Sequence, residues 1–435
     1  MIMKERNTVF GRTLAVLIVI YAFIVTYIDG HLKNVPNIHT YVLIPISLFA
    51  VFCFVYYLRD RLRVSVWIIP VLIYGLNVSI RYIVAGTQDM LAIWGCLLIL
   101  IIIAESIRLH DSFPYWIVLA FGYLQFSSMI VQMVFPSFFD DYLAVVFKSN
   151  ESIVAWSHSY GFSGLSFQVE FASLSLIFSE GYCLAKLFDG SLQKKAKYVY
   201  LLQFVLFVIA IALTGKRGTF AIAVVIPLIM LIIEKRTRKI GLIIALIGLL
   251  SALAFAFILV RFESAFQGNY LLERLSRSVV SLIRGDDFSS GRLSLWRKAL
   301  DVFYKFPLFG AGMHTYWYYS GTGMDPHNTY LETLSEQGIF GFILLVSLFI
   351  VCLVKTVQLK NKCNGTTAFA LSFSLFIQLE QILDSFVENS MTTNIIELMM
   401  YLCAIAVLNS AAVTEREKYF TIHIGFFDRS RSQKD

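Results

Sequence analysis

The sequence predicts an all-α membrane protein that crosses the bilayer many times, and three observations support this prediction. Apolar residues make up 58% of the 435 residues and charged residues only 15%, and the mean hydropathy is +0.71. A soluble globular chain of this length is much less apolar. Apolar runs of about 20 residues, enough to cross a bilayer as a helix, recur along the whole chain. The runs are continuous rather than alternating, which argues against a transmembrane β-barrel.

About twelve such runs are expected to span the membrane, within a single integral membrane domain over residues 1–435. The first run lacks a small-residue cleavage site and continues into "YIDGHLKNVP", so we expect an uncleaved span rather than a signal peptide. The approximate bounds of the expected spans are 13–28, 41–58, 64–84, 88–106, 115–135, 165–187, 198–214, 219–233, 240–260, 338–354, 366–385 and 393–411.

The distribution of basic residues predicts how the chain is oriented. Most of the 36 Lys and Arg residues fall in the N-terminal segment, in alternate connections and in the C-terminal tail. Lys and Arg residues close to membrane spans are enriched on the cytoplasmic side of the membrane. Both termini are therefore predicted to be cytoplasmic, in the cell membrane. The same bias accounts for the net charge of +7, so no nucleic-acid partner is expected.

Two outer connections are longer than the others. Residues 136–164 are rich in aromatic residues, and residues 261–337 are predicted to be an extracytoplasmic loop with helices of its own. Within this loop, "NYLLERLSRSVVSLIRG" and "GRLSLWRKALDVFYKFP" have apolar residues at helical spacing with basic residues between them, which is typical of amphipathic helices at a membrane surface. Ser289 and Ser290 are candidate caps of the second helix. No soluble domain is apparent, so any chemistry is expected on the outer face of the bundle.

Basic residues on the outer side are exceptions to the charge bias. Lys216 and Arg217 lie in the turn "LTGKRGTF" between two apolar runs, where a charge near the membrane suggests a functional site. The alternative is that both reach out to lipid phosphates. Arg292 follows a glycine at the start of a predicted interfacial helix, and its planar guanidinium suits bidentate binding of a phosphate. Together these residues favour an anionic ligand at the membrane surface, although Arg292 alone would be more typical of a solvated helix face.

A histidine in "DPHNTYLETLSEQGIFGF" is the candidate general base. His327 follows a turn-forming Asp-Pro pair at the entrance of a predicted helix, and an imidazole titrates near neutral pH. Gly338 and Gly341 are expected to permit close helix packing. His314 and His158 are alternatives on the same side, and a lone histidine at a membrane surface is more often without a role.

Aromatic and acidic residues give weaker indications. Tyr316 and Trp317 belong to the cluster "TYWYYSGTG", which suits either a membrane-interface belt or a stacking surface for sugar rings. Several acidic residues in or near spans could pair with buried cations or line a cavity, but they appear scattered along the sequence. These are Glu105, Glu170, Glu380, Asp384 and Glu397.

Several nucleotide and metal motifs are absent from the sequence. It has no Walker A motif, no GxGxxG, no HExxH and no outer DxD pair. Neither a nucleotide nor a metal cofactor is therefore expected.

The motifs of the long loop and its surroundings resemble those of the O-antigen ligase and Wzy-type polysaccharide polymerase superfamily. His327 and Asn328, then nine residues, then Gly338 and Gly341 are similar to the ligase pattern His-Asn-x9-Gly-x-x-Gly. "FPLFGAGMHTYW" resembles the segment that precedes it, and "SSGRLSLWRKAL" resembles the family's SGRxxxW helix. "LTGKRGTF" is similar to the family's turn, although Lys216 stands where a serine is usual. The resemblance covers roughly residues 198–355.

The resemblance implies a GT-C-like helical fold and a metal-independent, inverting glycosyl transfer from an undecaprenyl-diphosphate-linked sugar. Arg217 and Arg292 would hold the diphosphate, and His327 would deprotonate or position the acceptor hydroxyl. Lys216, Asn328, Tyr316, Trp317 and Arg297 are the candidate substrate-binding residues. A diphosphate is a good leaving group, so arginines that neutralise its developing charge can take the place of a metal.

The predicted function is the polymerisation of lipid-linked repeat units into a surface polysaccharide such as O-antigen, capsule or exopolysaccharide. The implied partners are the lipid-linked donor, a glycan acceptor, membrane lipid, a flippase and a chain-length regulator. The first alternative is a ligase that moves finished glycan to lipid A core, protein or a wall polymer. A second alternative is a transporter or flippase of lipid-linked sugar. Inverted repeats would favour this alternative, and the sequence contains no such repeat.

Overall fold

The computed structural model describes most of the chain. The described residues are 2–31, 38–58, 62–137, 161–166, 168–234, 237–261, 280, 284, 291–392, 394–415 and 417–422. Most of the first amphipathic segment of the long loop, most of the aromatic connection, Ser289, Ser290 and His158 lie outside these residues.

Helices dominate the described part of the chain, as the sequence predicts, and each expected span coincides with a helix. The helices that correspond to the expected spans are α1 (Ile2–His31), α2 (Ile38–Leu58), α3 (Ile69–Ala85), α4 (Gln88–Ile103), α6 (Tyr115–Val134), α9 (Val169–Phe188), α10 (Lys194–Leu213), α11 (Arg217–Ile233), α12 (Arg238–Arg261), α16 (Thr329–Lys360), α17 (Gly365–Asp384) and α18 (Ile395–Thr414). Shorter elements are the 3-10 turn η1 (Val66–Ile68), α5 (Leu109–Ser112), α14 (Arg292–Lys305) and α15 (Tyr316–Ser320).

The length and composition of these helices make the chain a multi-pass membrane protein. Among the described residues, nine helical segments are long and apolar enough to cross a bilayer, and α4 and α11 are shorter apolar helices. The prediction of about twelve spans is therefore confirmed as a many-spanning helical architecture, while the exact number and the GT-C likeness stay predictions.

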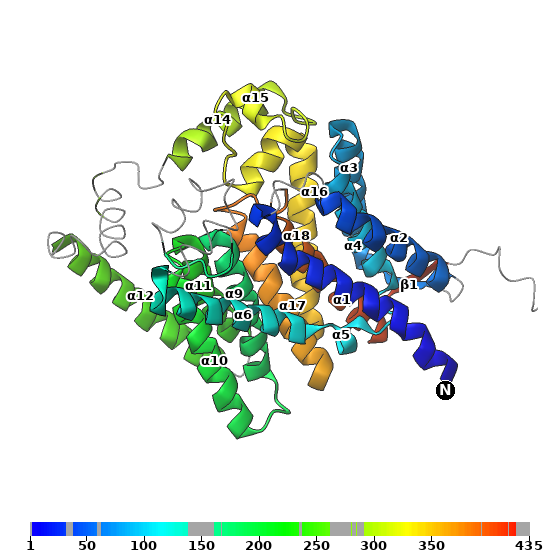
Figure 1. Cartoon of the computed structure of the whole chain (residues 1–435), viewed down its shortest axis with the longest axis horizontal. Helices are drawn as coiled ribbons and strands as arrows, with labels where there is room; N and C mark the ends of the chain where they lie inside the picture. The colour runs from blue at the N-terminus through cyan, green and yellow to red at the C-terminus, as the bar shows by residue number, and fades with distance from the viewer. Residues whose placement is uncertain are drawn as a thin grey trace, which may run out of the picture.

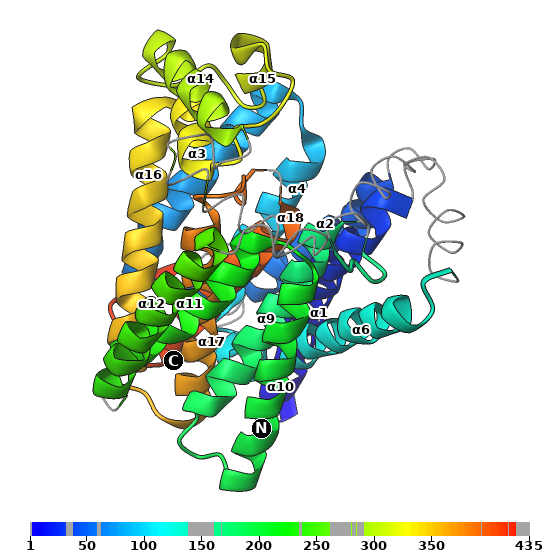
Figure 2. The same cartoon turned by 90° about the vertical axis from the view of Figure 1, so that its left-hand side faces the viewer.

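Three helices form the centre of the bundle. Helix α18 is almost wholly buried, with 94% of its apolar stretch inside the protein. For α9 and α17 the buried share is 72% each. Helix α17 packs against α18, α9 and α16, while α10 and α6 cover α9. Figures 1 and 2 show α14 and α15 together at one end of the bundle, above the start of α16. The first turn of α9 and the connection between α17 and α18 carry acidic residues of the site described below.

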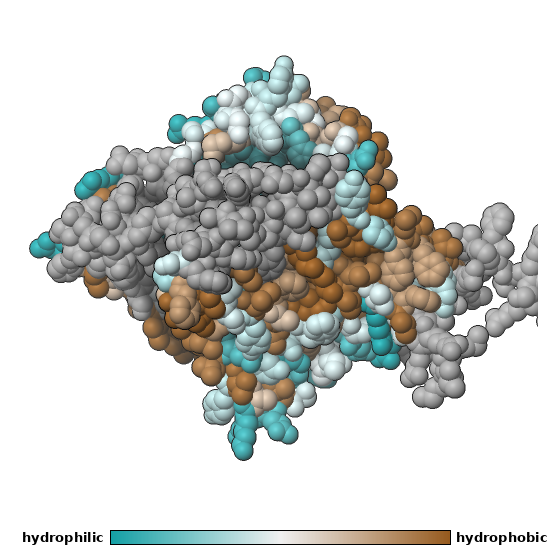
Figure 3. Space-filling view, in the orientation of Figure 1, coloured by the Kyte–Doolittle hydropathy of each residue, from teal (hydrophilic) through white to brown (hydrophobic). Residues whose placement is uncertain are grey.

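The outer surface of the helices is strongly apolar. Large hydrophobic side chains are exposed along α2, α3, α10 and α12, among them Leu48, Leu76, Leu202 and Ile243. In Figure 3 the hydrophobic residues on the visible face lie between a hydrophilic end formed by α14 and α15 and a hydrophilic end at the base of α10. This arrangement suits a bundle surrounded by lipid.

A small β-sheet is a feature that the all-α prediction missed. Strand β1 (Leu62–Ser65) pairs antiparallel with β2 (Tyr419–Ile422), which joins the segment before α3 to the segment after α18. The expected span 64–84 therefore begins in a strand and a 3-10 turn rather than in a helix. Sequence patterns cannot easily find a four-residue strand whose partner lies more than 350 residues away.

Helix α16 begins earlier than the expected span and is broken. It starts at Thr329 rather than at residue 338, and Gly338 interrupts it with φ 69° and ψ −170°. A β-carbon at Gly338 would lie 2.4 Å from the backbone carbonyl of Leu308. A glycine here therefore allows both the break in the helix and the close approach of the preceding loop. The expectation that Gly338 and Gly341 allow two helices to pack closely was wrong, because a β-carbon at Gly341 would meet Gln337 of the same helix.

Candidate functional site

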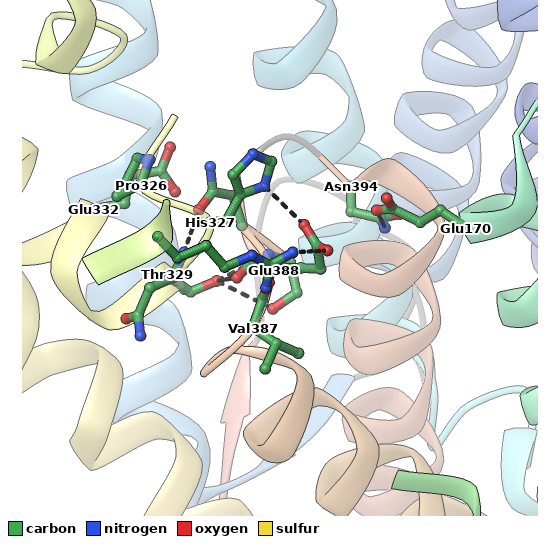
Figure 4. A network of polar contacts seen from close by, with 12 residues as sticks. Glu170, Pro326, His327, Thr329, Glu332, Val387, Glu388 and Asn394 are labelled. Atoms are coloured by element: carbon green, nitrogen blue, oxygen red, sulfur yellow. Dashed lines mark hydrogen bonds and ion pairs between the residues drawn. The ribbon is translucent and has the colours of Figure 1, made fainter. Parts of the chain in front are cut away.

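Four segments that are far apart in the sequence meet at one end of the bundle. They are the turn before α11, the first residue of α14, the residues before α16, and the connection between α17 and α18. The first three carry the basic residues and the histidine that the sequence singles out. The fourth carries Glu388, which lies between them (Figure 4).

Glu388 is the common partner of three basic side chains. Its Oε1 atom lies 2.7 Å from Nζ of Lys216 and 3.1 Å from Nη2 of Arg292. Its Oε2 atom lies 3.0 Å from Nδ1 of His327. Only 7% of the Glu388 side chain is exposed, whereas 35% of His327 is exposed, so the imidazole lies at the accessible edge of the cluster.

Lys216 joins a second carboxylate to the cluster. Its Nζ atom also lies 2.8 Å from Oε2 of Glu170, in the first turn of α9. Arg292 donates a further hydrogen bond to the carbonyl oxygen of Val387. With a neutral His327, the charges of Lys216 and Arg292 are balanced by those of Glu170 and Glu388. The basic residues thus already have anionic partners inside the protein.

The electrostatics of this cluster favour its charged form. Burial raises the pKa of the Glu388 carboxyl, but the neighbouring Lys216, His327 and Arg292 outweigh burial and hold this pKa well below its usual range. Burial lowers the pKa of Lys216, but Glu170 and Glu388 together raise it above its usual range. Lys216 and Glu388 therefore stay ionised at neutral pH.

Local structure fixes the place of His327 before α16. Its backbone adopts a left-handed conformation with φ 48°, which is uncommon for a residue other than glycine and indicates a position held by its surroundings. The next residue, Asn328, caps α16 by accepting a hydrogen bond from the amide of Leu331. Trp296 of α14 donates to the carbonyl oxygen of Pro326 at 3.0 Å, which ties the Arg292 helix to the His327 turn.

Asn328 has a structural place in this site. Its side-chain nitrogen donates to the carbonyl oxygen of Phe386, its backbone amide donates to Asn389 Oδ1, and its exposure is only 5%. Both ends of its amide are thus bonded within the protein and hold the turn that carries His327.

Two further candidate arginines lie on helices whose first turns adjoin the cluster. Arg217 is the first residue of α11, directly after Lys216, and is half-buried. Arg297 is exposed on α14, one and a half turns after Arg292. The α14 helix confirms the helical prediction for its segment, but its cap is Gly291 with φ 89°, not one of the two serines.

The aromatic cluster divides into buried and exposed residues. Tyr316 is fully buried, and its hydroxyl donates to the carbonyl oxygen of Leu295, so its ring faces the protein and not a sugar. Trp317 is 49% exposed, and its indole nitrogen donates to Asp325. The alternative base His314 packs against the ring of Tyr82 with centroids 5.9 Å apart, and burial lowers its pKa.

Three acidic residues gather inside the bundle. Carboxylate oxygens of Glu380, Asp384 and Glu397 lie within 4.8 Å of one another, and all three residues are buried. The sequence interpretation of these residues as scattered was therefore wrong for this group, whose members come from α17 and α18. Glu170 fulfils the other expectation, because it pairs with a buried cation. Such a group can share protons or supply oxygen ligands to a cation.

Sequence reasoning missed Glu388. The signal was an acidic residue in the short connection "SFVENSMTTN" between the last two expected spans, on the same side as Lys216, Arg292 and His327. Basic residues near a membrane need counter-charges, and a search for one in the outer connections would have found it.

Comparison with known proteins finds that part of the chain matches a family. Residues 202–346 match the family model described as O-antigen ligase. The match includes Lys216, Arg217, Arg292 and His327, whereas Glu388 lies beyond its end. A comparison with curated proteins finds no match.

Proposed function

We propose that the protein polymerises lipid-linked repeat units. The premise is that residues 202–346 match an O-antigen ligase domain, which makes the chain a membrane enzyme of the O-antigen ligase and polymerase type that acts on lipid-linked glycans. In this proposal it transfers a growing glycan from undecaprenyl diphosphate to the hydroxyl of another lipid-linked repeat unit, on the outer face of the cell membrane. The observation that carries the proposal is the convergence of Lys216, Arg292 and His327 on Glu388.

The donor diphosphate is proposed to bind Lys216, Arg217 and Arg292. A diphosphate offers charged oxygens that can replace the Oε1 atom of Glu388 next to Lys216 and Arg292, which lie 2.7 and 3.1 Å from that atom. Charge-assisted hydrogen bonds from arginine are strong and directional. They stabilise the negative charge that develops on the leaving diphosphate.

His327 is proposed to act as the general base. When its Nδ1–H donates to Oε2 of Glu388, the lone pair on Nε2 faces away from that carboxylate and can accept the proton of an acceptor hydroxyl. The acceptor oxygen then forms a bond to the anomeric carbon, and the bond from that carbon to the diphosphate oxygen breaks. The products are the longer glycan and undecaprenyl diphosphate, with inversion at the anomeric carbon.

Ligation to a different acceptor is the second candidate, and the description of the matched family favours it. Donor binding and proton transfer would be the same, and only the molecule that supplies the hydroxyl would differ. Glycans from cells with and without the protein distinguish the two. Single repeat units left on the usual acceptor indicate a polymerase, and full-length chains left on the lipid carrier indicate a ligase.

The test of the mechanism uses the lipid-linked glycan that accumulates in cells lacking the protein. Purified wild-type enzyme in lipid nanodiscs should release undecaprenyl diphosphate from this extract, measured by mass spectrometry. His327→Ala and Arg292→Ala should each lower the rate by about 100-fold or more, as expected for a lost base or a lost charge-stabilising donor.

A matched control is Arg108→Ala, because the Arg108 side chain is 65% exposed and pairs with the neighbouring Asp111 at 2.6 Å. This variant should keep the wild-type rate. Wild-type rates from His327→Ala or from Arg292→Ala would overturn the roles proposed for these residues.

A further inference from the structure

The short helical segment before the break in α16 joins the candidate site to another part of the molecule. This segment, Thr329–Gln337, begins two residues after His327 and ends directly before Gly338. At its first end it is bonded to the connection after α17, since the amide of Thr329 donates to the carbonyl oxygens of Ser385 and Glu388 at 2.9 and 3.0 Å. Whatever holds the other end therefore influences where His327 lies.

The loop 307–312 crosses the break in α16 by backbone hydrogen bonds. The amides of Ala311 and Gly312 donate to the carbonyl oxygens of Ser335 and Glu336 at 2.9 and 3.0 Å. Beyond the break, the amide of Ile339 donates to the carbonyl oxygen of Pro307 at 2.9 Å. Because this loop follows α14, the break also connects the helix of Arg292 to that of His327.

A guanidinium from a distant helix satisfies three carbonyl oxygens at this break. Arg81 of α3 donates from Nη1 to the carbonyl oxygens of Phe309 and Glu336, at 2.9 and 3.2 Å, and from Nη2 to that of Gln337 at 3.3 Å. Two of these carbonyls belong to the last turn of the segment, whose acceptors lack helical partners at a break. A cation there also interacts favourably with the helix dipole.

The orientation of Arg81 is fixed by a neighbour on its own helix. Its Nε atom donates to Oδ1 of Asn77 at 3.1 Å, and Nδ2 of Asn77 donates to Oε1 of Gln337 at 3.0 Å. Two guanidinium nitrogens thus bond the break directly, and the third bonds Asn77, which itself contacts Gln337. A lysine has a single nitrogen and no planar fork, so it cannot reproduce this set of bonds.

We propose that Arg81 is a positioning residue, which holds the broken end of the segment Thr329–Gln337 so that His327 faces the bound donor and acceptor. The proposal rests on the general-base role proposed for His327. Arg81 itself touches neither the basic residues nor Glu388, so it acts on proton transfer and not on donor binding.

The expected kinetic result follows from this separation. Arg81→Ala should lower kcat for release of undecaprenyl diphosphate by about 10 to 100-fold, as small displacements of catalytic groups do. KM for the lipid-linked glycan extract should stay within about twofold of the wild type, because the diphosphate site is intact. Arg81→Lys should recover part of the lost kcat, and Arg108→Ala is again the matched arginine control.

Asn77→Ala provides a milder version of the same change, in case Arg81→Ala does not fold. It removes the amide that orients the guanidinium and should lower kcat in the same direction with KM unchanged. Hydrogen exchange measured by mass spectrometry should show faster amide exchange in residues 307–312 and 329–340 of both variants, with α18 unchanged.

Three outcomes would overturn the proposal. They are wild-type kcat in Arg81→Ala and Asn77→Ala, a raised KM with unchanged kcat, and faster exchange spread evenly over the helices. Normal Arg81 variants beside an inactive His327→Ala would overturn the positioning role alone. An active His327→Ala would overturn the proposed function itself.

Discussion

The two ends of the segment Thr329–Gln337 are held by opposite kinds of contact. At the His327 end, ion pairs between side chains converge on Glu388, and a ligand with its own negative charge can replace that carboxylate. At the Gly338 end, backbone hydrogen bonds hold the chain, and the guanidinium of Arg81 donates to backbone carbonyl oxygens. In the proposed mechanism, the His327 end binds the donor and the Gly338 end stays fixed.

The same contrast explains two glycines at the break in α16. Gly338 and Gly310 lie at the fixed end, where both backbones have positive φ and where a β-carbon would collide with the opposite backbone at 2.4 and 2.2 Å. The binding end tolerates charge rearrangement, whereas the fixed end tolerates almost no added volume. Four experiments test this contrast.

The largest effect is expected from Gly338→Ala. The variant should lose roughly 3 kcal/mol or more of stability, because it combines backbone strain with a collision against the loop. Thermal unfolding followed by tryptophan fluorescence in detergent measures the change. Gly95→Ala in α4 is the control, since nothing lies within 4 Å of a β-carbon there. Equal unfolding temperatures for the two variants would remove the distinction between the ends.

Glu388→Gln should have the next largest effect. Loss of the carboxylate leaves Arg292 without its ion pair, and the single amide oxygen of glutamine cannot replace both oxygens that face Arg292 and His327, at a cost of about 3 kcal/mol. Release of undecaprenyl diphosphate should fall at least about tenfold. Glu417→Gln is the control, because Glu417 pairs with Lys355 and Lys362 near the protein surface and should cost at most about 1 kcal/mol. Wild-type stability and activity in Glu388→Gln would contradict its central position.

The pH dependence of stability should reveal the same cluster with a smaller signal. The pKa of Glu388 is lowered from 4.5, so its stabilising contribution is present above about pH 4.5 and is lost as the pH falls below that value. The pKa of Lys216 is raised from 10.5, so its contribution is present below about pH 10.5 and is lost at higher pH. The difference in unfolding temperature between wild type and Glu388→Gln should therefore be constant from about pH 5 to 10. A steady decline of that difference across neutral pH would contradict the assignment.

The smallest effect is expected from Trp317→Ala. If the half-exposed indole stacks on the acceptor sugar, KM for the acceptor should rise by a few-fold with little change in stability. Tyr318→Ala, which removes an 84% exposed ring next to it, is the control and should leave KM unchanged. Identical KM values for both variants and the wild type would contradict a role for Trp317 in binding the acceptor sugar.

The sequence was sufficient for the spans and for the basic residues but not for their partners. Apolar runs located helices such as α17 and α18, because a membrane helix is specified by local composition. Lys216 and His327 stood out because a charge or an imidazole near a membrane is unusual. Glu388 was missed because its importance comes from partners 61 and 172 residues away in the chain.

The break in α16 was hidden for a related reason. Gly338 reads as an ordinary small residue of a membrane helix, and only the loop that crosses it shows why it must be a glycine. Arg81 is one basic residue within an apolar run, and its three carbonyl partners lie more than 220 residues later. Sequence patterns report local preference, whereas this junction depends on tertiary contacts.

The cap at Asn328 and the break at Gly338 also fix the length of the helical segment between them. An α-helix turns by about 100° and rises about 1.5 Å with each residue, so the nine residues between these two points set the direction in which His327 leaves the helix. Substitutions within this segment change its surface but not the direction in which His327 leaves the helix. One inserted or deleted residue would turn the imidazole by about 100° away from Glu388, even if every side chain of the site were retained.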